Sequence, residues 1–224
     1  MNKKFEFTGE TTTIEFEFRT VTLHRIRAIK NFGIVKVGDI GGWLEKKENL
    51  SQEGNAWVYD NAKVFGDANV CGDAKVWGNA KVYDNANVWG NADVYDNAKV
   101  YGDANVCGDA EVWGNAKVYG DAEVFGDANV CGDANVCGDA NVFLASHVLV
   151  IGSIGSKNDF ATFYRGKDKQ IMVKCGCFND TINKFLEKVK RTHGDTKYAL
   201  VYQKAAELAK IQIDLGGKAK ESEE

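Results

Sequence analysis

Lysine recurs at a constant interval in the middle of this chain, at positions 63, 81, 99 and 117, and an aromatic residue follows each lysine two positions later. An ammonium group is a compact charge that suits a phosphate or carboxylate, and an aromatic ring can stack on a base. The commoner explanation of such a pattern is that lysines keep an aromatic surface soluble. The alternative is a site for a small anionic ligand such as a nucleotide, formed by Lys63, Lys81, Lys99, Lys117, Tyr83, Tyr101 and Tyr119.

Histidine is the commonest general base in enzymes, and this chain contains His24, His147 and His193. His193 ends a predicted helix, where a structural role is expected. His147 is therefore the one plausible base. The sequence has neither a nucleophile–base motif nor a glycine-rich phosphate loop. We predict no catalytic residue and no enzymatic activity.

The elements that must position the lysine–aromatic pairs are short repeats. Residues 54–143 divide into fifteen hexapeptides with the pattern Gly/Asp, Asn/Asp, Ala, variable, Val, aromatic/Cys. Side chains alternate between faces in an extended segment, so Ala and Val share one face, and the variable and aromatic residues share the other. The two residues that open each unit suit a sharp bend. Each unit therefore predicts a short strand followed by a corner.

Three corners would close a triangular coil of three hexapeptides, whose narrow interior admits only Ala and Val. Successive coils would stack as parallel strands about 4.8 Å apart. This arrangement resembles the left-handed parallel β-helix of hexapeptide-repeat proteins. We therefore predict a mainly β fold with that architecture over residues 54–155.

The three sides of the predicted coil carry different side chains. We name them face one, face two and face three; they start at residues 57–59, 63–65 and 69–71, and each recurs at every third hexapeptide. Faces one and three carry large apolar side chains, which usually mark a partner site when they are exposed together. We predict a homo-oligomer whose interface contains Trp77, Trp89, Trp113, Phe125 and Phe143. A different protein could occupy the same surfaces.

The six cysteines do not predict disulfides in this geometry. Cys71 and Cys107 would lie two coils apart, roughly 9–10 Å by strand spacing, which exceeds the ~7 Å limit between the Cα atoms of a bridge. Cys175-Gly-Cys177 is shorter than the Cys-x2-Cys pair typical of zinc sites. We predict no metal site and no cofactor.

Different sequence flanks the repeats on both sides. Residues 1–53 predict an N-terminal β cap with Trp43 as a plug over the first coil, and residues 144–155 could form most of a sixth coil. Residues 156–215 predict a small ββαα module, and residues 216–224 a disordered tail. The segment beginning GGWLEKKENLSQEGNAWVY is similar to the opening of YdcK-like bacterial and prophage repeat proteins. That resemblance supports a cap that runs directly into the β-helix.

Charge and hydropathy argue against several classes of protein. The repeats carry five lysines and fourteen acidic residues, a net charge of −9, which opposes general binding to nucleic acid. No stretch of about 18 apolar residues predicts a membrane span, and the N-terminus lacks the apolar run of a signal peptide. We expect a cytoplasmic protein that binds neither nucleic acid nor membranes.

The leading functional hypothesis is a non-enzymatic β-helical scaffold that self-associates and presents its aromatic and lysine faces to a partner. A second is a phage-type decoy that sequesters a small anionic ligand, such as a nucleotide, at a subunit interface. The resemblance to hexapeptide-repeat proteins implies a third, because acyltransferases share that fold. Those enzymes use a catalytic histidine and usually a loop extruded from a coil, whereas these repeats contain no histidine and no insertion.

Overall fold

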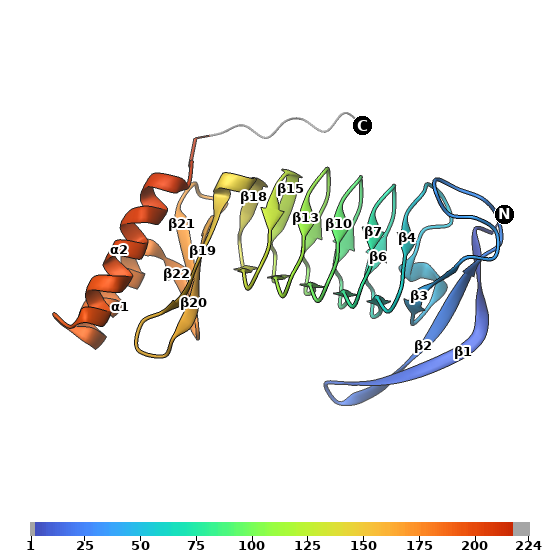
Figure 1. Ribbon diagram of the computed structural model, residues 1–224, viewed down its shortest axis with the longest axis horizontal. Coiled ribbons are helices and arrows are strands. Elements are labelled where there is room, and N and C mark those ends of the chain that lie inside the picture. Colours follow the sequence, from blue (N-terminus) through green and yellow to red (C-terminus); the bar gives the residue numbers. More distant parts are fainter. Residues whose placement is uncertain (1–2, 217–224) are drawn as a thin grey trace.

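A three-sided rod forms the middle of the molecule (Figure 1). The computed structural model describes residues 3–216. Short strands from successive coils pair in parallel on each side, and partners are three hexapeptides apart in sequence, as for Lys81 and Lys99. The predicted mainly β fold of stacked coils, a parallel β-helix, is confirmed.

Each coil contributes one strand to each face. Face one consists of β4 (Trp57–Val58), β7 (Lys75–Val76), β10 (Asp93–Val94), β13 (Glu111–Val112) and β16 (Asn129–Val130). Face two contains β5 (Lys63–Val64), β8 (Lys81–Val82), β11 (Lys99–Val100), β14 (Lys117–Tyr119) and β17 (Asn135–Cys137). Face three consists of β6 (Asn69–Val70), β9 (Asn87–Val88), β12 (Asn105–Val106), β15 (Glu123–Asp127) and β18 (Asn141–Leu144).

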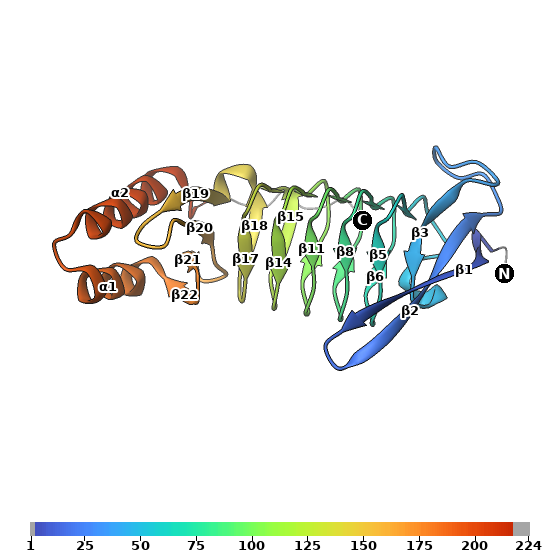
Figure 2. The same ribbon diagram turned by 60° about the horizontal axis from the view of Figure 1, so that its bottom comes forward.

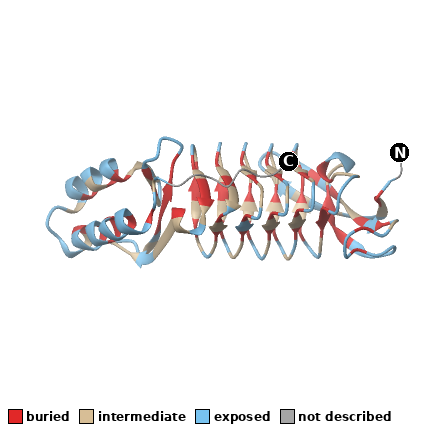
Figure 3. Cartoon of the chain, turned by 90° about the horizontal axis from the view of Figure 1, so that it is seen from above, coloured by how far each residue is buried: buried red, intermediate tan, exposed pale blue. Residues whose placement is uncertain are grey.

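Alanine and valine fill the interior of the rod, as the repeat predicts. Every Ala and Val at these two positions of the repeat is at most 1% exposed, and Figure 3 shows the buried residues along the coils. The valines stack in register, as Val82, Val100 and Val118 do on face two. The core is therefore a narrow apolar column that continues from coil to coil.

The corners depend on a residue in the left-handed backbone conformation, with φ of 71° at Gly102 and 59° at Asp84. A Cβ atom at Gly102 would lie 2.9 Å from the amide nitrogen of Gly120 in the next coil, which explains the preference for glycine. Where aspartate replaces glycine, a hydrogen bond to its carboxylate offsets the cost of the left-handed backbone conformation. Asp84 Oδ2 accepts a hydrogen bond from the Gly102 amide at 3.2 Å, so this corner is tied to the coil above it.

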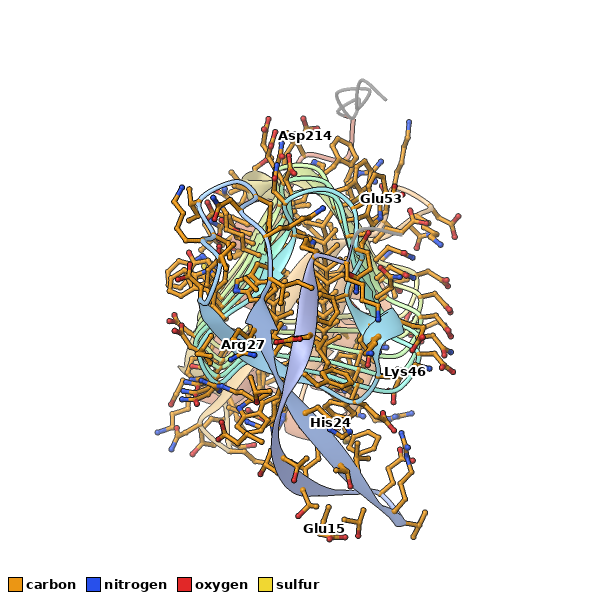
Figure 4. The ribbon with its side chains drawn as sticks, turned by 90° about the vertical axis from the view of Figure 1, so that its right-hand side faces the viewer. Glu15, His24, Arg27, Lys46, Glu53 and Asp214 are labelled. Carbon is orange, nitrogen blue, oxygen red and sulfur yellow. The ribbon has the colours of Figure 1, made fainter. Side chains whose placement is uncertain are left out.

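A long hairpin begins the chain and projects from the rod. β1 (Phe5–Phe16) pairs antiparallel with β2 (Arg19–Ala28), and we call this hairpin the arm. Seen along the rod, Glu15 near the tip of the arm lies beyond the stacked coils (Figure 4). β3 (Ile40–Leu44) then pairs antiparallel with β2 and parallel with β5. The arm therefore continues the sheet of face two.

The position predicted for Trp43 is wrong. Trp43 lies in register with Lys63 and packs outside the rod against Leu23 and Phe65, because β3 is a degenerate repeat that places Trp43 at the outward variable position. Its neighbour Leu44 takes the inward valine position. Leu44 and Phe5, both 0% exposed, belong to the core at this end of the rod.

Polar side chains close the N-terminal end of the β-helix, where carbonyl groups of the first coil have no preceding coil to bond. The buried Lys4 donates from Nζ to the Ala56 carbonyl oxygen at 2.8 Å. Asn49, at the end of the 3-10 helix η1 (Lys47–Asn49), donates from Nδ2 to the Ala68 carbonyl oxygen at 2.8 Å. Buried carbonyl groups that would otherwise be unpaired are thereby satisfied.

The C-terminal module has four strands, two more than predicted. A 3-10 helix, η2 (Ala145–His147), leads into an antiparallel sheet of β19 (Val148–Ile154), β20 (Asp159–Arg165), β21 (Ile171–Cys175) and β22 (Phe178–Thr181). The helices α1 (Ile182–His193) and α2 (Lys197–Gln212) follow. Neither helix, within the part of the chain that the structure describes, is long and apolar enough to cross a membrane. The tail predicted at 216–224 lies outside the described residues apart from Gly216.

The expected sixth coil over residues 144–155 does not form. β19 pairs antiparallel with β20, because this segment lacks the corner residues of the repeat and instead offers an apolar run, VLVI. β20 lies at the open end of the rod. Its Thr162 Oγ1 accepts a hydrogen bond from the Asn135 amide at 3.0 Å, and Arg165 donates to the Asn141 carbonyl oxygen at 3.1 Å.

Candidate functional site

The structure brings the predicted lysine–aromatic pairs together on one side of the rod. Lys63, Lys81, Lys99 and Lys117 occupy neighbouring register positions on face two. Figure 2 shows this face between the arm and the C-terminal module. Parallel strands are about 4.8 Å apart, so the ammonium groups form a column of like charge. Such a column is stabilised when an anion binds to it.

The aromatic residues beside these lysines form a continuous ladder of stacked rings. The ring centroids of Phe65 and Tyr83 are 5.0 Å apart, those of Tyr83 and Tyr101 4.9 Å, and those of Tyr101 and Tyr119 4.8 Å. The planes of each pair are within 3° of parallel. Both faces of Tyr83 and Tyr101 are therefore covered by other rings, and a ligand can reach only their edges.

The two ends of the ladder differ. At the N-terminal end, Phe16 of the arm packs edge-on against Phe65 and Tyr83, with centroid distances of 5.0 and 5.1 Å. At the C-terminal end, Cys137 occupies the next register position after Tyr119. Among the described residues, Tyr101 is the ring that stacks on Tyr119. The ladder thus ends at Tyr119, and the buried Cys137 takes the place of the next ring.

A hollow of about 280 Å³ lies at this end of the ladder, and we call it the end hollow. Face two contributes Tyr101, Lys117, Tyr119 and Asn135 to its lining, and the C-terminal module contributes Asp159, Phe160, Lys174 and Gly176. The lining is predominantly polar. Of the seven predicted ligand-binding residues, Tyr101, Lys117 and Tyr119 line the end hollow, while the other four lie further along face two.

The end hollow combines two cations with neutral phenols. Neither Lys117 nor Lys174 forms a salt bridge within the described part of the chain. Burial raises the pKa of the Tyr101 and Tyr119 hydroxyls, so both phenols are protonated at neutral pH and can donate hydrogen bonds. Asp159 Oδ1 accepts a hydrogen bond from the Phe160 amide at 2.8 Å. Two ammonium groups, two phenols and the edges of the tyrosine rings suit an anionic ligand that carries a ring.

Sequence reasoning missed five of the eight lining residues for identifiable reasons. Asn135 lies one coil beyond Lys117 in the same column, so the constant spacing of the lysines could have located it. Asp159, Phe160 and Lys174 belong to the C-terminal module, which packs against face two through tertiary contacts. Their positions follow no spacing in the repeat.

His147, the one plausible general base, has a structural position. Its side chain is 0% exposed, and Nδ1 accepts a hydrogen bond from the Phe143 amide at 3.4 Å. The Phe143 ring packs edge-on against the imidazole, with centroids 4.4 Å apart. A general base must reach the proton that it removes, and this imidazole instead accepts a hydrogen bond from the last coil.

Burial lowers the pKa of His147 to about 4, and the nearby Arg165 contributes further. An exposed histidine in the unfolded chain has a pKa of about 6.5. Between these values the unfolded state binds the extra proton, so His147 makes the free energy of unfolding fall as the pH drops from about 6.5 to 4. We expect this group to cost about 3 kcal/mol between pH 7 and pH 4.

The measurement is urea denaturation at several pH values for the native chain and for His147→Gln. Glutamine stays neutral and has a side-chain oxygen that can accept a hydrogen bond from the backbone amide of Phe143. We expect the difference in stability between the two proteins to shrink or reverse as the pH falls. Parallel curves for the two proteins would contradict a neutral, buried His147.

Comparison with curated proteins shows a partial similarity. The chain is 45% identical over 42 residues to the uncharacterized acetyltransferase YdcK of Escherichia coli (strain K12). The match spans 19% of this chain and 13% of that protein. No protein-family model matches the chain. The predicted resemblance to YdcK-like repeat proteins is thus confirmed for a short segment, and it extends to only a small part of the relative.

The residues predicted at an oligomer interface lie on two faces. Trp77 and Trp113 belong to face one, where Tyr95 stacks between them. Trp89 and Phe125 belong to face three, and Trp89 is 41% exposed. Trp77 is 37% exposed, and Trp113 and Phe125 are half-buried. Phe125 also packs against Phe143 at a centroid distance of 5.4 Å.

Phe143 must be removed from the predicted interface. It is 4% exposed, because the Arg165 guanidinium lies 4.8 Å from its ring centroid and His147 packs against its edge. The C-terminal module therefore uses Phe143 as an internal contact. Among residues 3–216, no group of three His, Cys, Asp or Glu side chains could hold a metal ion.

Proposed function

We propose that this chain is a non-enzymatic β-helical binding protein that holds a small anionic, ring-bearing molecule in the end hollow. The observation that carries the proposal is the end hollow, where Tyr101 and Tyr119 lie beside Lys117 and Lys174. Neither lysine forms a salt bridge within the described part of the chain. A ligand ring would pack against the accessible edges of the two tyrosine rings. Its phosphate or carboxylate would bind Lys117 and Lys174.

The wall of the end hollow makes this site better than the open part of face two. Exposed charge pairs contribute little, because water and salt screen them. Phe160 and Gly176 of the C-terminal module cover one side of the hollow, which excludes part of the solvent around Lys117. Asn135 and Asp159 can bond to the polar edge of the ligand ring. A ligand with both a ring and an anionic group should therefore bind more tightly than inorganic phosphate.

The test is calorimetric titration of the native chain with AMP, inorganic phosphate and acetyl-CoA at about 0.15 M salt. We expect heat from at least one ring-bearing anion and weaker or no heat from phosphate. Lys117→Ala and Lys174→Ala should each weaken that binding about tenfold, equivalent to about 1.4 kcal/mol. Lys81→Ala is the matched control, because Lys81 belongs to the same column but does not line the end hollow.

Binding that is unchanged in Lys117→Ala, or weakened equally in Lys81→Ala, would contradict the proposed site. Tyr119→Phe separates the two roles of that residue, because phenylalanine keeps the ring and loses the hydroxyl. We expect Tyr119→Phe to retain binding and Tyr119→Ala to lose it. The absence of heat from all three compounds would leave the lysines as a solubilising surface.

An acyltransferase activity is the second candidate, favoured by the 42-residue similarity to a protein named an acetyltransferase. We place it second because His147 is buried and lines neither the end hollow nor either of two further hollows, one beside α1 and one beside Trp77. Acetyl-CoA incubated with the chain and a panel of amines and alcohols would release free thiol if the chain were such an enzyme. Steady thiol release that His147→Gln abolishes would overturn the proposal of a non-enzymatic protein.

A further inference from the structure

Helix α2 carries its large apolar side chains on the side that faces away from the protein. Leu200, Val201, Leu208 and Ile211 are 55, 40, 49 and 83% exposed. The inward side of the same helix is built mostly from small residues, Ala199, Ala205, Ala206 and Ala209, together with Tyr202. A surface helix normally places its larger apolar residues toward the core. In α2 both sides are apolar, which is typical of a helix packed on two sides.

Helix α1 provides an internal comparison, because it belongs to the same module and has the usual pattern. Its buried residues are Ile182, Phe185 and Val189, and its other side is rich in lysine. Figures 1 and 3 show both helices at the end of the molecule, with exposed residues along them. Exposure at this end therefore does not explain the composition of α2. The outward apolar side chains belong to α2 alone of the two helices.

We propose that this outward side of α2 binds the same helix of a second copy of the chain in an antiparallel, two-fold arrangement. In an antiparallel pair related by a two-fold axis, residues that face each other have numbers with a constant sum. Leu200 would face Ile211 of the second copy, and Lys204 would face Glu207, since both pairs have the same sum. Each contact occurs twice, as an isologous interface requires.

The side chains at the centre of the contact support this orientation. Lys204 and Glu207 lie between the apolar positions, and their side chains are 66 and 60% exposed. Within one chain, Lys204 Nζ is 2.7 Å from Glu207 Oε2. A parallel pair of helices would bring each residue near its own copy and place like charges together. The antiparallel pair instead forms alternating charges at the centre with apolar contacts at both ends. This interface is separate from face two and does not depend on the proposed ligand.

The first test is the mass of the full chain in solution, by sedimentation velocity up to about 100 µM, since a single helix pair makes a small interface. We expect twice the monomer mass of 24.6 kDa. The double variant Leu208→Glu/Ile211→Glu should dissociate at least tenfold more readily. Asn183→Glu/Lys190→Glu, which adds two acidic residues to exposed positions of α1, should not. A monomer at every concentration, or a dimer that tolerates the α2 variant, would overturn the proposal.

The second test fixes the orientation. Lys204→Glu and Glu207→Lys are each expected to weaken the dimer, because like charges then meet at its centre. When the two variants are mixed, the carboxylate introduced at position 204 of one chain would face the ammonium introduced at position 207 of the other. The native Glu207 of the first chain would likewise face the native Lys204 of the second. A mixed dimer should therefore form. The charge mismatch within each chain persists in that mixture, so recovery can arise only between chains. Failure of the mixture to dimerise, while the native chain does, would exclude the antiparallel register. Circular dichroism of each variant verifies that α2 remains folded.

Discussion

A Val100→Asp variant is expected to lose about 3–5 kcal/mol of stability, the largest effect of any single substitution in the repeats. Val100 is 0% exposed and lies between Val82 and Val118 in the apolar column of face two. A carboxylate there has no donor in the described interior and no route to water. The coils above and below share this column, so the damage would extend along the rod.

Urea denaturation followed by tryptophan fluorescence measures the loss, since the five tryptophans lie in residues 43–113. Asn87→Asp is the matched control. It adds the same charge at an outward position of face three, where the neighbours in register are Asn69 and Asn105. We expect the control to lose less than about 1 kcal/mol. A similar loss in the two variants would contradict the assignment of inside and outside.

The second large effect is expected at Tyr164, which joins the rod to the C-terminal module. Its ring is 0% exposed and belongs to the core of the β-helix, whereas its neighbour Phe163 belongs to the core of the module. The Tyr164 hydroxyl lies 3.0 Å from the Cys137 carbonyl oxygen and 2.9 Å from Asn179 Oδ1. Tyr164→Ala should therefore cost about 3–5 kcal/mol, because it leaves a cavity at the end of the rod.

Tyr164→Phe separates packing from hydrogen bonding. It keeps the ring and leaves the buried Cys137 carbonyl oxygen without the hydroxyl donor, so we expect a smaller loss of about 1–3 kcal/mol. Phe163→Ala is a useful comparison, because it should destabilise the helices of the module before the β-helix. Loss of far-UV helical signal at lower urea than loss of tryptophan signal would reveal that order. If Tyr164→Ala left the unfolding midpoint unchanged, Tyr164 could not be the residue that closes the rod.

The sequence predicted the fold of residues 54–143 because every hexapeptide has the same pattern of inward, outward and corner residues. Each Val requires an inward position, and each opening Gly or Asp a corner, so the coil follows from one unit. The same spacing placed Lys117 and Tyr119 side by side. Trp43 and residues 148–154 were predicted wrongly because no repeat constrains them. Trp43 was assigned by its size, whereas the register of β3 with β5 decides its side.

The end hollow and the outward side of α2 could not be predicted from the repeat, because both depend on how the C-terminal module packs. Lys174 and Phe160 reach face two because β20 packs across the last coil, through contacts such as that of Thr162 with Asn135. The apolar residues of α2 are visible in the sequence. Their periodicity alone does not say which side of the helix the sheet covers, and the larger residues were expected inward.

The closure of both ends by Lys4 and Asn49 on one side and by Thr162 and Arg165 on the other gives the molecule a fixed length. That length can change only in steps. Duplication of one whole coil would move the arm and the C-terminal module apart by about 4.8 Å and keep both on face two. Insertion of a single hexapeptide before Tyr101 would rotate the module and the last coils together by a third of a turn, so that the arm and the module would lie on different faces. The rod therefore sets the separation of the arm and the C-terminal module in steps of one coil, and the fifteen hexapeptides, which make five whole coils, place both of them on face two.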